Sequence, residues 1–174
     1  GVDYDDRKEI LKVTVVNNGD GTLTATAEYD EDGASFVNTY TAGGSATFKG
    51  KKTLKNHDLA DGQFEFTLTP VDDAPGEKQT VVNSGDGSIT FDKVAYTEAD
   101  AGKTYTYWIT EVNSNSTGYI YDSRTVEATV KITDKGDGSL SCDITYSDGS
   151  EAAFENSYKA LSTSLSLKAV KQLE

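Results

Sequence analysis

Apolar and polar residues alternate along most of the chain, and clusters of Gly, Asp and Asn separate the alternating runs. Alternation with a period of two residues places one set of side chains on a single face of a β-strand. Runs of this kind, bounded by turn residues, predict an antiparallel β-sandwich. The predicted strands are 46–54, 62–69, 79–83, 88–94, 103–112, 125–133, 139–147 and 152–158, and residues 98–102 are expected to hold one helical turn.

The chain contains an internal repeat. Residues 1–40 and 118–158 are two versions of one sequence. The matching pieces are 1–7 with 118–124, 19–23 with 136–140, and 35–40 with 153–158. The end of the chain repeats as well, because residues 167–173 have lysines and apolar residues at most of the same positions as residues 48–54. We therefore expect three parts: 1–41 as the C-terminal part of a preceding repeat, 42–159 as a complete repeat, and 160–174 as the first strand of a following repeat.

Three polar residues of the complete repeat fall on strand faces that should be apolar. They alternate with apolar neighbours as follows: Lys52 with Phe48 and Leu54, Glu111 with Tyr107 and Ile109, and Asn156 with Phe154 and Tyr158. Charged residues are almost never fully buried without a partner, and an unpaired buried charge costs several kcal/mol. We therefore expect Lys52, Glu111 and Asn156 to form one buried cluster.

Such a cluster has the groups needed to form an amide. Burial favours the neutral forms, so it lowers the pKa of Lys52 and raises the pKa of Glu111. A neutral amine is a nucleophile, and a protonated carboxyl group can polarise the Asn156 carbonyl and shuttle protons. Attack on the Asn156 carboxamide would expel ammonia and leave a Lys–Asn isopeptide bond. The competing interpretation is a hydrogen-bonded cluster that does not react.

Four motifs in this order resemble the streptococcal-type pilin isopeptide-linkage domain, an immunoglobulin-like module of Gram-positive pilins and surface adhesins. The motifs are Lys52–Leu54, Gly62–Leu68, Tyr105–Glu111 and Phe154–Tyr158. The resemblance covers nearly all of residues 42–159. It implies an immunoglobulin-like sandwich with an intramolecular bond between Lys52 and Asn156, assisted by Glu111. The nearby Lys49, Lys51 and Lys55 are set aside because the alternation and the repeat select Lys52.

The partial repeats hold only remnants of the same site. Asn38 corresponds to Asn156, and Lys171 corresponds to Lys52. Neither partial repeat holds the other two residues of the cluster, so neither can complete a site within this chain. An open alternative is strand exchange, in which Lys171 of one molecule meets the 1–40 segment of another.

Composition excludes several classes of function. The net charge of −13 argues against nucleic acid and anionic membrane surfaces as partners, and no apolar run is long enough to span a membrane. His57 and Cys142 are the single His and Cys of the chain, so no zinc site and no Ser-His-Asp or Cys-His set can be built. We interpret Cys142 as a packing residue, and we expect no metal and no cofactor.

These observations favour a structural role over an enzyme with turnover. The first hypothesis is a shaft repeat of a Gram-positive surface protein, whose partners are the neighbouring repeats. A cell-surface location is implied by the resemblance alone. The alternative is a host-protein- or glycan-binding module on the same sandwich, with loops 72–76 and 113–117 or the aromatic strand around Trp108 as its binding surface.

Overall fold

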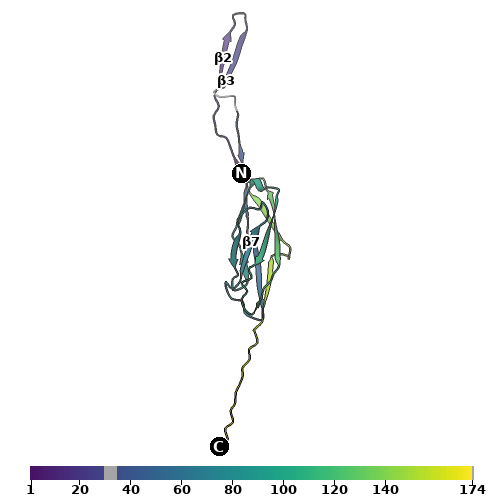
Figure 1. Cartoon of the computed structure of the whole chain (residues 1–174). Helices are drawn as coiled ribbons and strands as arrows, with labels where there is room; N and C mark the ends of the chain where they lie inside the picture. Colours follow the sequence, from purple (N-terminus) through teal and green to yellow (C-terminus); the bar gives the residue numbers. More distant parts are fainter. Residues whose placement is uncertain (30–34, 174) are drawn as a thin grey trace.

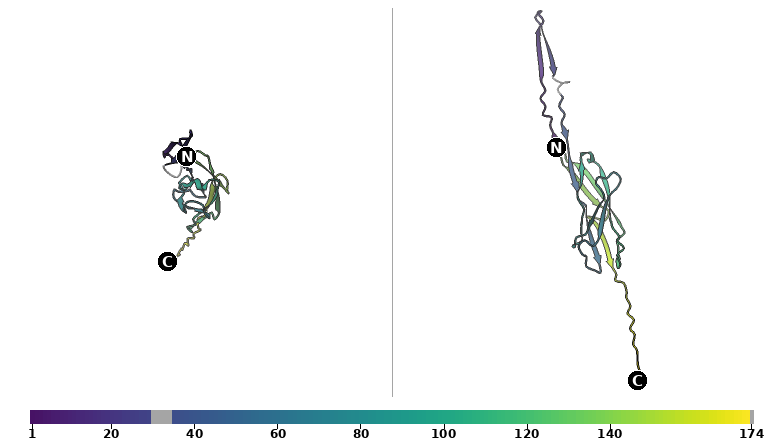
Figure 2. Two further views of the ribbon diagram at one scale, coloured as in Figure 1. Left: turned by 90° about the horizontal axis from the view of Figure 1, so that it is seen from above. Right: turned by 60° about the vertical axis from the view of Figure 1, so that its left-hand side comes forward.

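The computed structural model describes residues 1–29 and 35–173. It is an elongated β-protein in which a sandwich lies between two extensions (Figure 1; Figure 2). The arm, described over residues 1–29 and 35–40, projects from one end of the sandwich, and the tail, residues 160–173, leaves from the other.

Two sheets form the sandwich, with the strand orders β14-β13-β11-β7-β8 and β12-β15-β6-β9. The strands of the first sheet are β7 (Glu65–Pro70), β8 (Gln79–Val82), β11 (Thr104–Glu111), β13 (Thr125–Asp134) and β14 (Leu140–Tyr146). Those of the second are β6 (Lys49–Lys55), β9 (Ser88–Thr90), β12 (Tyr119–Ile120) and β15 (Ala152–Tyr158). A short pair, β5 (Gly43–Ala46) with β10 (Val94–Thr97), and the 3₁₀ helix η1 (Glu98–Asp100) complete the sandwich. The predicted all-β sandwich and the single helical turn are confirmed.

Two runs that were predicted as single strands are each divided in the structure. Residues 46–54 are divided between β5 and β6, and residues 88–94 between β9 and β10. Both breaks lie at the same level, where the Phe91 N–H donates to the Phe48 carbonyl at 3.1 Å. There the chain leaves the β5–β10 pair and enters the four-stranded sheet. Phe48 and Phe91 stay buried across the breaks, so the alternation continues where the pairing changes.

The strands β6 and β15 lie side by side and run parallel, so the sandwich is not antiparallel throughout. Lys52 lies opposite Phe154, and Leu54 lies opposite Asn156. Gly50 permits the close approach of the two strands, because a Cβ at this position would lie 2.7 Å from the Ala152 carbonyl oxygen. The pairing places the beginning of the sandwich directly beside its end.

The core between the sheets is aromatic and aliphatic. Its fully buried side chains include Phe66 and Tyr107 from one sheet and Phe154 from the other. The rings of Phe66 and Phe154 lie 5.2 Å apart, centroid to centroid, and join the two layers. Lys52 and Asn156 lie in this same core with 1% and 0% of their surface exposed. Two polar groups are therefore enclosed by an apolar layer, as the alternation predicts.

The arm repeats the pairing registers of the sandwich. Its strands are β1 (Val2–Asp3), β2 (Leu11–Asn17), β3 (Leu23–Tyr29) and β4 (Thr39–Tyr40). Matching cross-strand pairs are Val2 with Tyr40 and Tyr119 with Tyr158, then Leu11 with Tyr29 and Ala128 with Tyr146. Val13 and Val15 of the arm remain 56% and 58% exposed, because the described residues of the arm form no counterpart of β6, β7 or β11 to cover them. The assignment of the arm to a preceding repeat stays a prediction.

A group of hydrogen bonds joins the arm to the sandwich. The Tyr40 hydroxyl donates to Asp134 Oδ1 at 2.7 Å and accepts from the Gly138 N–H at 3.2 Å. The Gly138 carbonyl accepts from the Gly43 N–H at 3.2 Å. The β13–β14 turn of the sandwich therefore contacts both the last strand of the arm and the segment that follows it.

The tail is extended and exposed, and no strand is assigned within residues 160–173. A strand needs a neighbour to satisfy its backbone N–H and C=O groups, and the described residues offer none to the tail. Residue 174, the last of the predicted segment 160–174, lies outside the described residues. The expectation that this segment begins a following repeat stays a prediction. Across residues 1–29 and 35–173, no helix has the length and hydrophobicity required for a membrane span.

Candidate functional site

The structure brings Lys52, Glu111 and Asn156 into one cluster between the sheets. The Lys52 ammonium donates to Glu111 Oε2 at 2.7 Å, and both side chains are fully buried. The Asn156 Nδ2 donates to the other carboxylate oxygen, Oε1. One carboxyl group therefore bridges the lysine nitrogen and the amide nitrogen.

Lys52 is positioned by backbone contacts at the centre of β6. Its N–H donates to the Gly87 carbonyl at 2.7 Å. Gly87 has a φ of +87°, and a Cβ there would lie 2.2 Å from the Lys52 carbonyl oxygen. The turn before β9 can approach Lys52 only because residue 87 is a glycine. The lysine backbone is thus fixed on both sides, by β15 and by this turn.

Apolar rings surround the charged groups of the cluster. Glu111 ends β11 and pairs in register with Phe66 of β7. The Lys52 Nζ lies 4.7 Å from the centroid of the Phe64 ring and 5.8 Å from that of Phe66. These rings exclude water, and their faces provide only weak electrostatic compensation for an ammonium group. The site therefore has a low local dielectric constant.

Burial shifts both ionisable groups toward their neutral forms. Desolvation lowers the pKa of Lys52, although the Glu111 carboxylate beside it acts in the opposite direction. Desolvation also raises the pKa of Glu111, against the opposing effects of Lys52 and Asn156. Transfer of one proton from the ammonium to the carboxylate gives a neutral amine and a neutral acid, the two forms that amide formation requires.

The hydrogen bond at the Asn156 carbonyl differs from the sequence prediction. Glu111 was expected to polarise this carbonyl, but its carboxyl group contacts the amide nitrogen instead. Asn156 Oδ1 accepts from the backbone N–H of Asp122 at 2.7 Å. A backbone N–H is always a donor, so it must face the oxygen of the carboxamide, and the NH₂ group must then face the carboxylate. Glu111 is thus placed for proton transfer between two nitrogens.

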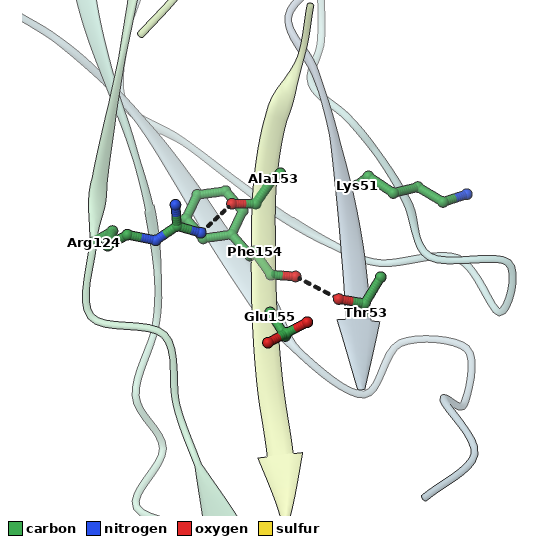
Figure 3. A pocket seen from close by; sticks show the side chains of 6 residues that line it. All are labelled: Lys51, Thr53, Arg124, Ala153, Phe154 and Glu155. Carbon is green, nitrogen blue, oxygen red and sulfur yellow. Dashed lines mark hydrogen bonds between the residues drawn. The ribbon is translucent and has the colours of Figure 1, made fainter. Parts of the chain in front are cut away.

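The lysines that neighbour Lys52 lie outside the cluster. Lys49 and Lys55 are exposed, and Lys55 pairs with Glu155 at 2.6 Å. Lys51 lines a surface hollow of about 350 Å³ over β6 and β15, which contains none of the three cluster residues (Figure 3). Alternation along β6 therefore separates Lys52 from the three lysines around it.

The structure does not bring Asn38 and Lys171 together. Asn38 is exposed in the arm, where its Oδ1 accepts from the Asp5 N–H at 3.1 Å. Lys171 is exposed in the tail, and the tail leaves the sandwich at the end opposite to the arm (Figure 1). Neither residue belongs to the buried cluster, and the idea that they are remnants of neighbouring sites stays a prediction.

Other candidate chemistry does not converge on a site. Cys142 is partly buried and packs against the core, and burial raises its thiol pKa. Asp134 and Asp137 accept hydrogen bonds from backbone N–H groups of their own turn. Within the part of the chain that the structure describes, no group of three or more His, Cys, Asp or Glu side chains is placed to hold a metal ion.

Sequence reasoning missed Asp122 and Arg124. The Asp122 N–H contacts the Asn156 oxygen, and Arg124 donates to the Asp122 carboxylate. A backbone donor carries no signature in the sequence. The available signal was the Asp-x-Arg spacing, which occurs at residues 122–124 and again at residues 5–7.

A comparison with family models identifies what the chain is similar to. The model of FctA, described as a Spy0128-like isopeptide containing domain, matches residues 1–41 and 48–159. The match covers nearly the whole chain and confirms the resemblance inferred from the four motifs. No match was found among curated proteins.

Proposed function

Because the chain belongs to the family of Spy0128-like isopeptide containing domains, we propose that Lys52 and Asn156 become joined by an isopeptide bond that forms without another enzyme. The observation that carries this proposal is the bridging position of Glu111. Its two carboxyl oxygens contact the Lys52 nitrogen and the Asn156 amide nitrogen within one dry cluster.

The proposed reaction exchanges one amine for another on the Asn156 carbonyl carbon. The lone pair of neutral Lys52 Nζ attacks this carbon, and the carbonyl π electrons move to Oδ1. Glu111 accepts a proton from Nζ and delivers a proton to Nδ2. The bond between the carbonyl carbon and Nδ2 then breaks, ammonia leaves, and a secondary amide remains. Atoms and charge balance, and Glu111 ends in the protonation state in which it began. The fold supplies the proximity, an effect worth up to ~7–11 kcal/mol of the barrier.

We infer that the bond serves a structural role in the shaft of a Gram-positive surface pilin or adhesin. The residues involved lie on β6 and β15, the first and last strands of the two main sheets. A bond between them would close nearly the whole repeat into one covalent loop. The elongated arrangement in Figure 1 and the registers shared by the arm and the sandwich support an array of repeats joined end to end. In such an array the partners of each repeat are its neighbours.

The first test is the intact mass of the purified chain. Loss of one ammonia lowers the mass by about 17 Da relative to the sequence. We expect this deficit in the unmodified chain and its absence in Glu111→Ala, because the proton shuttle is lost. Lys51→Ala is the matched control, since Lys51 neighbours Lys52 in sequence but lies on the outer face; it should keep the deficit. A full mass for the unmodified chain would leave an unreacted polar cluster and contradict the proposal.

The rate of bond formation should depend on pH with a maximum. The Lys52–Glu111 pair can exist as an ion pair or as a neutral amine beside a neutral acid. Both forms carry the same number of protons, so a change of pH does not alter the ratio between them. In acid the pair gains a second proton and the amine stays charged, and in base Glu111 loses the proton it must deliver. Burial raises the pKa of Glu111 from 4.5 and lowers that of Lys52 from 10.5. The pH values at which the rate falls off on the acid side and on the basic side should therefore both lie closer to pH 7 than 4.5 and 10.5.

This pH dependence can be measured on chain that is isolated unfolded and unreacted in urea. Dilution into buffers of different pH starts folding, and the fraction with the lower mass is followed over time. A rate that rises steadily with pH across the whole range, as for an exposed amine, would show that Glu111 does not supply a proton.

A further inference from the structure

We propose that the backbone N–H of Asp122 stabilises the negative charge that develops on Asn156 Oδ1 when Lys52 attacks. The Asp122 carboxylate and the Arg124 guanidinium act as positioning residues that hold this N–H in place. We call these two residues the Asp–Arg clamp. The inference rests on the proposed crosslinking function and adds a donor that the sequence did not reveal.

The N–H of Asp122 is aimed at the atom where charge develops. It donates to Asn156 Oδ1 at 2.7 Å before any reaction. Attack on the carbonyl carbon moves an electron pair onto this oxygen. A donor fixed in advance at a developing oxyanion lowers the barrier, because it need not reorganise during the reaction. Glu111 cannot take this role while its oxygens contact the two nitrogens.

The Asp–Arg clamp fastens the Asp122 backbone to β15 on the N-terminal side of Asn156. The Asp122 carboxylate accepts from the Glu155 N–H at 3.1 Å and from the Arg124 N–H at 3.0 Å. The Arg124 guanidinium donates to Asp122 Oδ2 at 2.8 Å and to the Ala153 carbonyl at 2.7 Å. Figure 3 shows this last bond, with Arg124 reaching across to the β15 backbone. The residues held, 153 and 155, both precede the reacting asparagine, and residue 155 is its immediate neighbour.

The Asp122 carboxylate is ionised at neutral pH. Its side chain is 7% exposed, and burial alone would raise its pKa. Hydrogen bonds from Arg124 and from the Glu155 N–H outweigh this effect and lower the pKa to about 2. The clamp is therefore fully charged at neutral pH and does not itself exchange protons with the cluster.

The arm contains a second copy of the clamp. The Asp5 N–H donates to Asn38 Oδ1 at 3.1 Å, and the Asp5 carboxylate accepts from the N–H groups of Arg7 at 3.1 Å and Val37 at 2.9 Å. The Arg7 guanidinium donates to the Ser35 carbonyl, as Arg124 does to Ala153. Residues 1–29 and 35–40 form no counterpart of β6 or β11. The donor is thus placed on the carboxamide by contacts within the arm, without an attacking lysine or a bridging acid.

The test compares Asp122→Ala with Asp5→Ala, which removes the same side chain from the copy in the arm. Unreacted chain is refolded from urea, and the intact mass is followed over time. We expect Asp122→Ala to slow crosslinking by about tenfold or more, because the donor loses its alignment, and Asp5→Ala to react at the unmodified rate. Asp122→Asn should recover part of the rate, because its single amide oxygen can still accept from one of the two N–H groups, Glu155 or Arg124, that now donate to separate carboxylate oxygens.

A second pair of variants protects the test against failure to fold. Arg124→Gln keeps Asp122 and should slow the reaction several-fold, whereas Arg7→Gln should not. Equal rates for Asp122→Ala and Asp5→Ala would overturn the inference, as would Asp122→Asn reacting as slowly as Asp122→Ala. If the unmodified chain itself never loses about 17 Da, the proposed function fails. The two failures are therefore distinguishable within one set of time courses.

Discussion

The Asn156→Ala chain is expected to release far more length than the unmodified chain when the two ends are pulled apart. In the crosslinked chain, force passes along β6 to Lys52, through the isopeptide bond, and out along β15. The residues between positions 52 and 156, about 100 in number, are bypassed and cannot extend. Without the bond they unravel, which adds about 350 Å of contour length at ~3.5 Å per residue. The sandwich should also yield at lower force, because only non-covalent contacts then resist separation of β6 from β15.

Single-molecule force spectroscopy checks this expectation. The β2–β3 hairpin of the arm unfolds in both chains, so its contribution cancels in the comparison. Lys51→Ala is again the matched control and should behave as the unmodified chain. If Asn156→Ala yields at the same force and to the same extension as the unmodified chain, the mechanical role is wrong.

The second large effect is expected from Lys52→Met. This change removes the crosslink, whose loop of about 100 residues is worth ~4.7 kcal/mol in the chain-entropy treatment. It also removes the Lys52 nitrogen that contacts Glu111, and a buried acceptor left without its hydrogen bond costs ~1–3 kcal/mol. The total of about 7 kcal/mol is comparable to the whole stability of an ordinary domain. We expect the variant to be largely unfolded at 37 °C.

The double variant Lys52→Met/Glu111→Gln separates the two contributions. It also lacks the crosslink, but it buries no lone acid, and the Gln oxygen can still accept from the Asn156 amide. It should be about 1–3 kcal/mol more stable than Lys52→Met in urea titrations at pH 7. Equal stability of the single and double variants would show that the lone carboxyl group carries no penalty.

The pH dependence of the two variants provides an independent check. The folded pKa of Glu111 is raised by burial, and removal of Lys52 takes away a group that lowers it. An acid with a raised folded pKa contributes stability below its unfolded pKa and loses that contribution as pH rises through the folded value. Lys52→Met should therefore become less stable as the pH rises above about 4.5. The double variant should not show this loss.

Sequence reasoning located the cluster because a period of two makes a polar residue in an apolar phase conspicuous. Lys52, Glu111 and Asn156 each interrupt such a phase, and all three are buried in the structure. The same rule produced the error at residues 46–54. Ala46 and Phe48 are both buried, although the chain changes sheets between them and Lys49. Alternation reports burial, and it carries no information about which strand is the neighbour.

The orientation of the Asn156 amide could not be predicted for a related reason. The chemistry of amide formation assigns an acid to the carbonyl, and Glu111 was the only acid in the predicted cluster. The donor that faces the oxygen belongs to the backbone of Asp122, more than thirty residues away in sequence. The parallel pairing of β6 with β15 is likewise a property of the topology, because neither strand has a turn that joins it to the other.

The contact between Tyr40 and the β13–β14 turn has a consequence for an array of repeats. Tyr40 is hydrogen-bonded to both Asp134 and Gly138, so the arm cannot swivel about the peptide that connects it to the sandwich without losing these bonds. Tyr158 occupies the same position at the end of the sandwich. If each junction repeats this contact, every repeat is rotated by the same fixed angle about the long axis relative to the one before it. A surface feature such as the half-exposed Trp108 would then trace a helix of fixed pitch along the fibre.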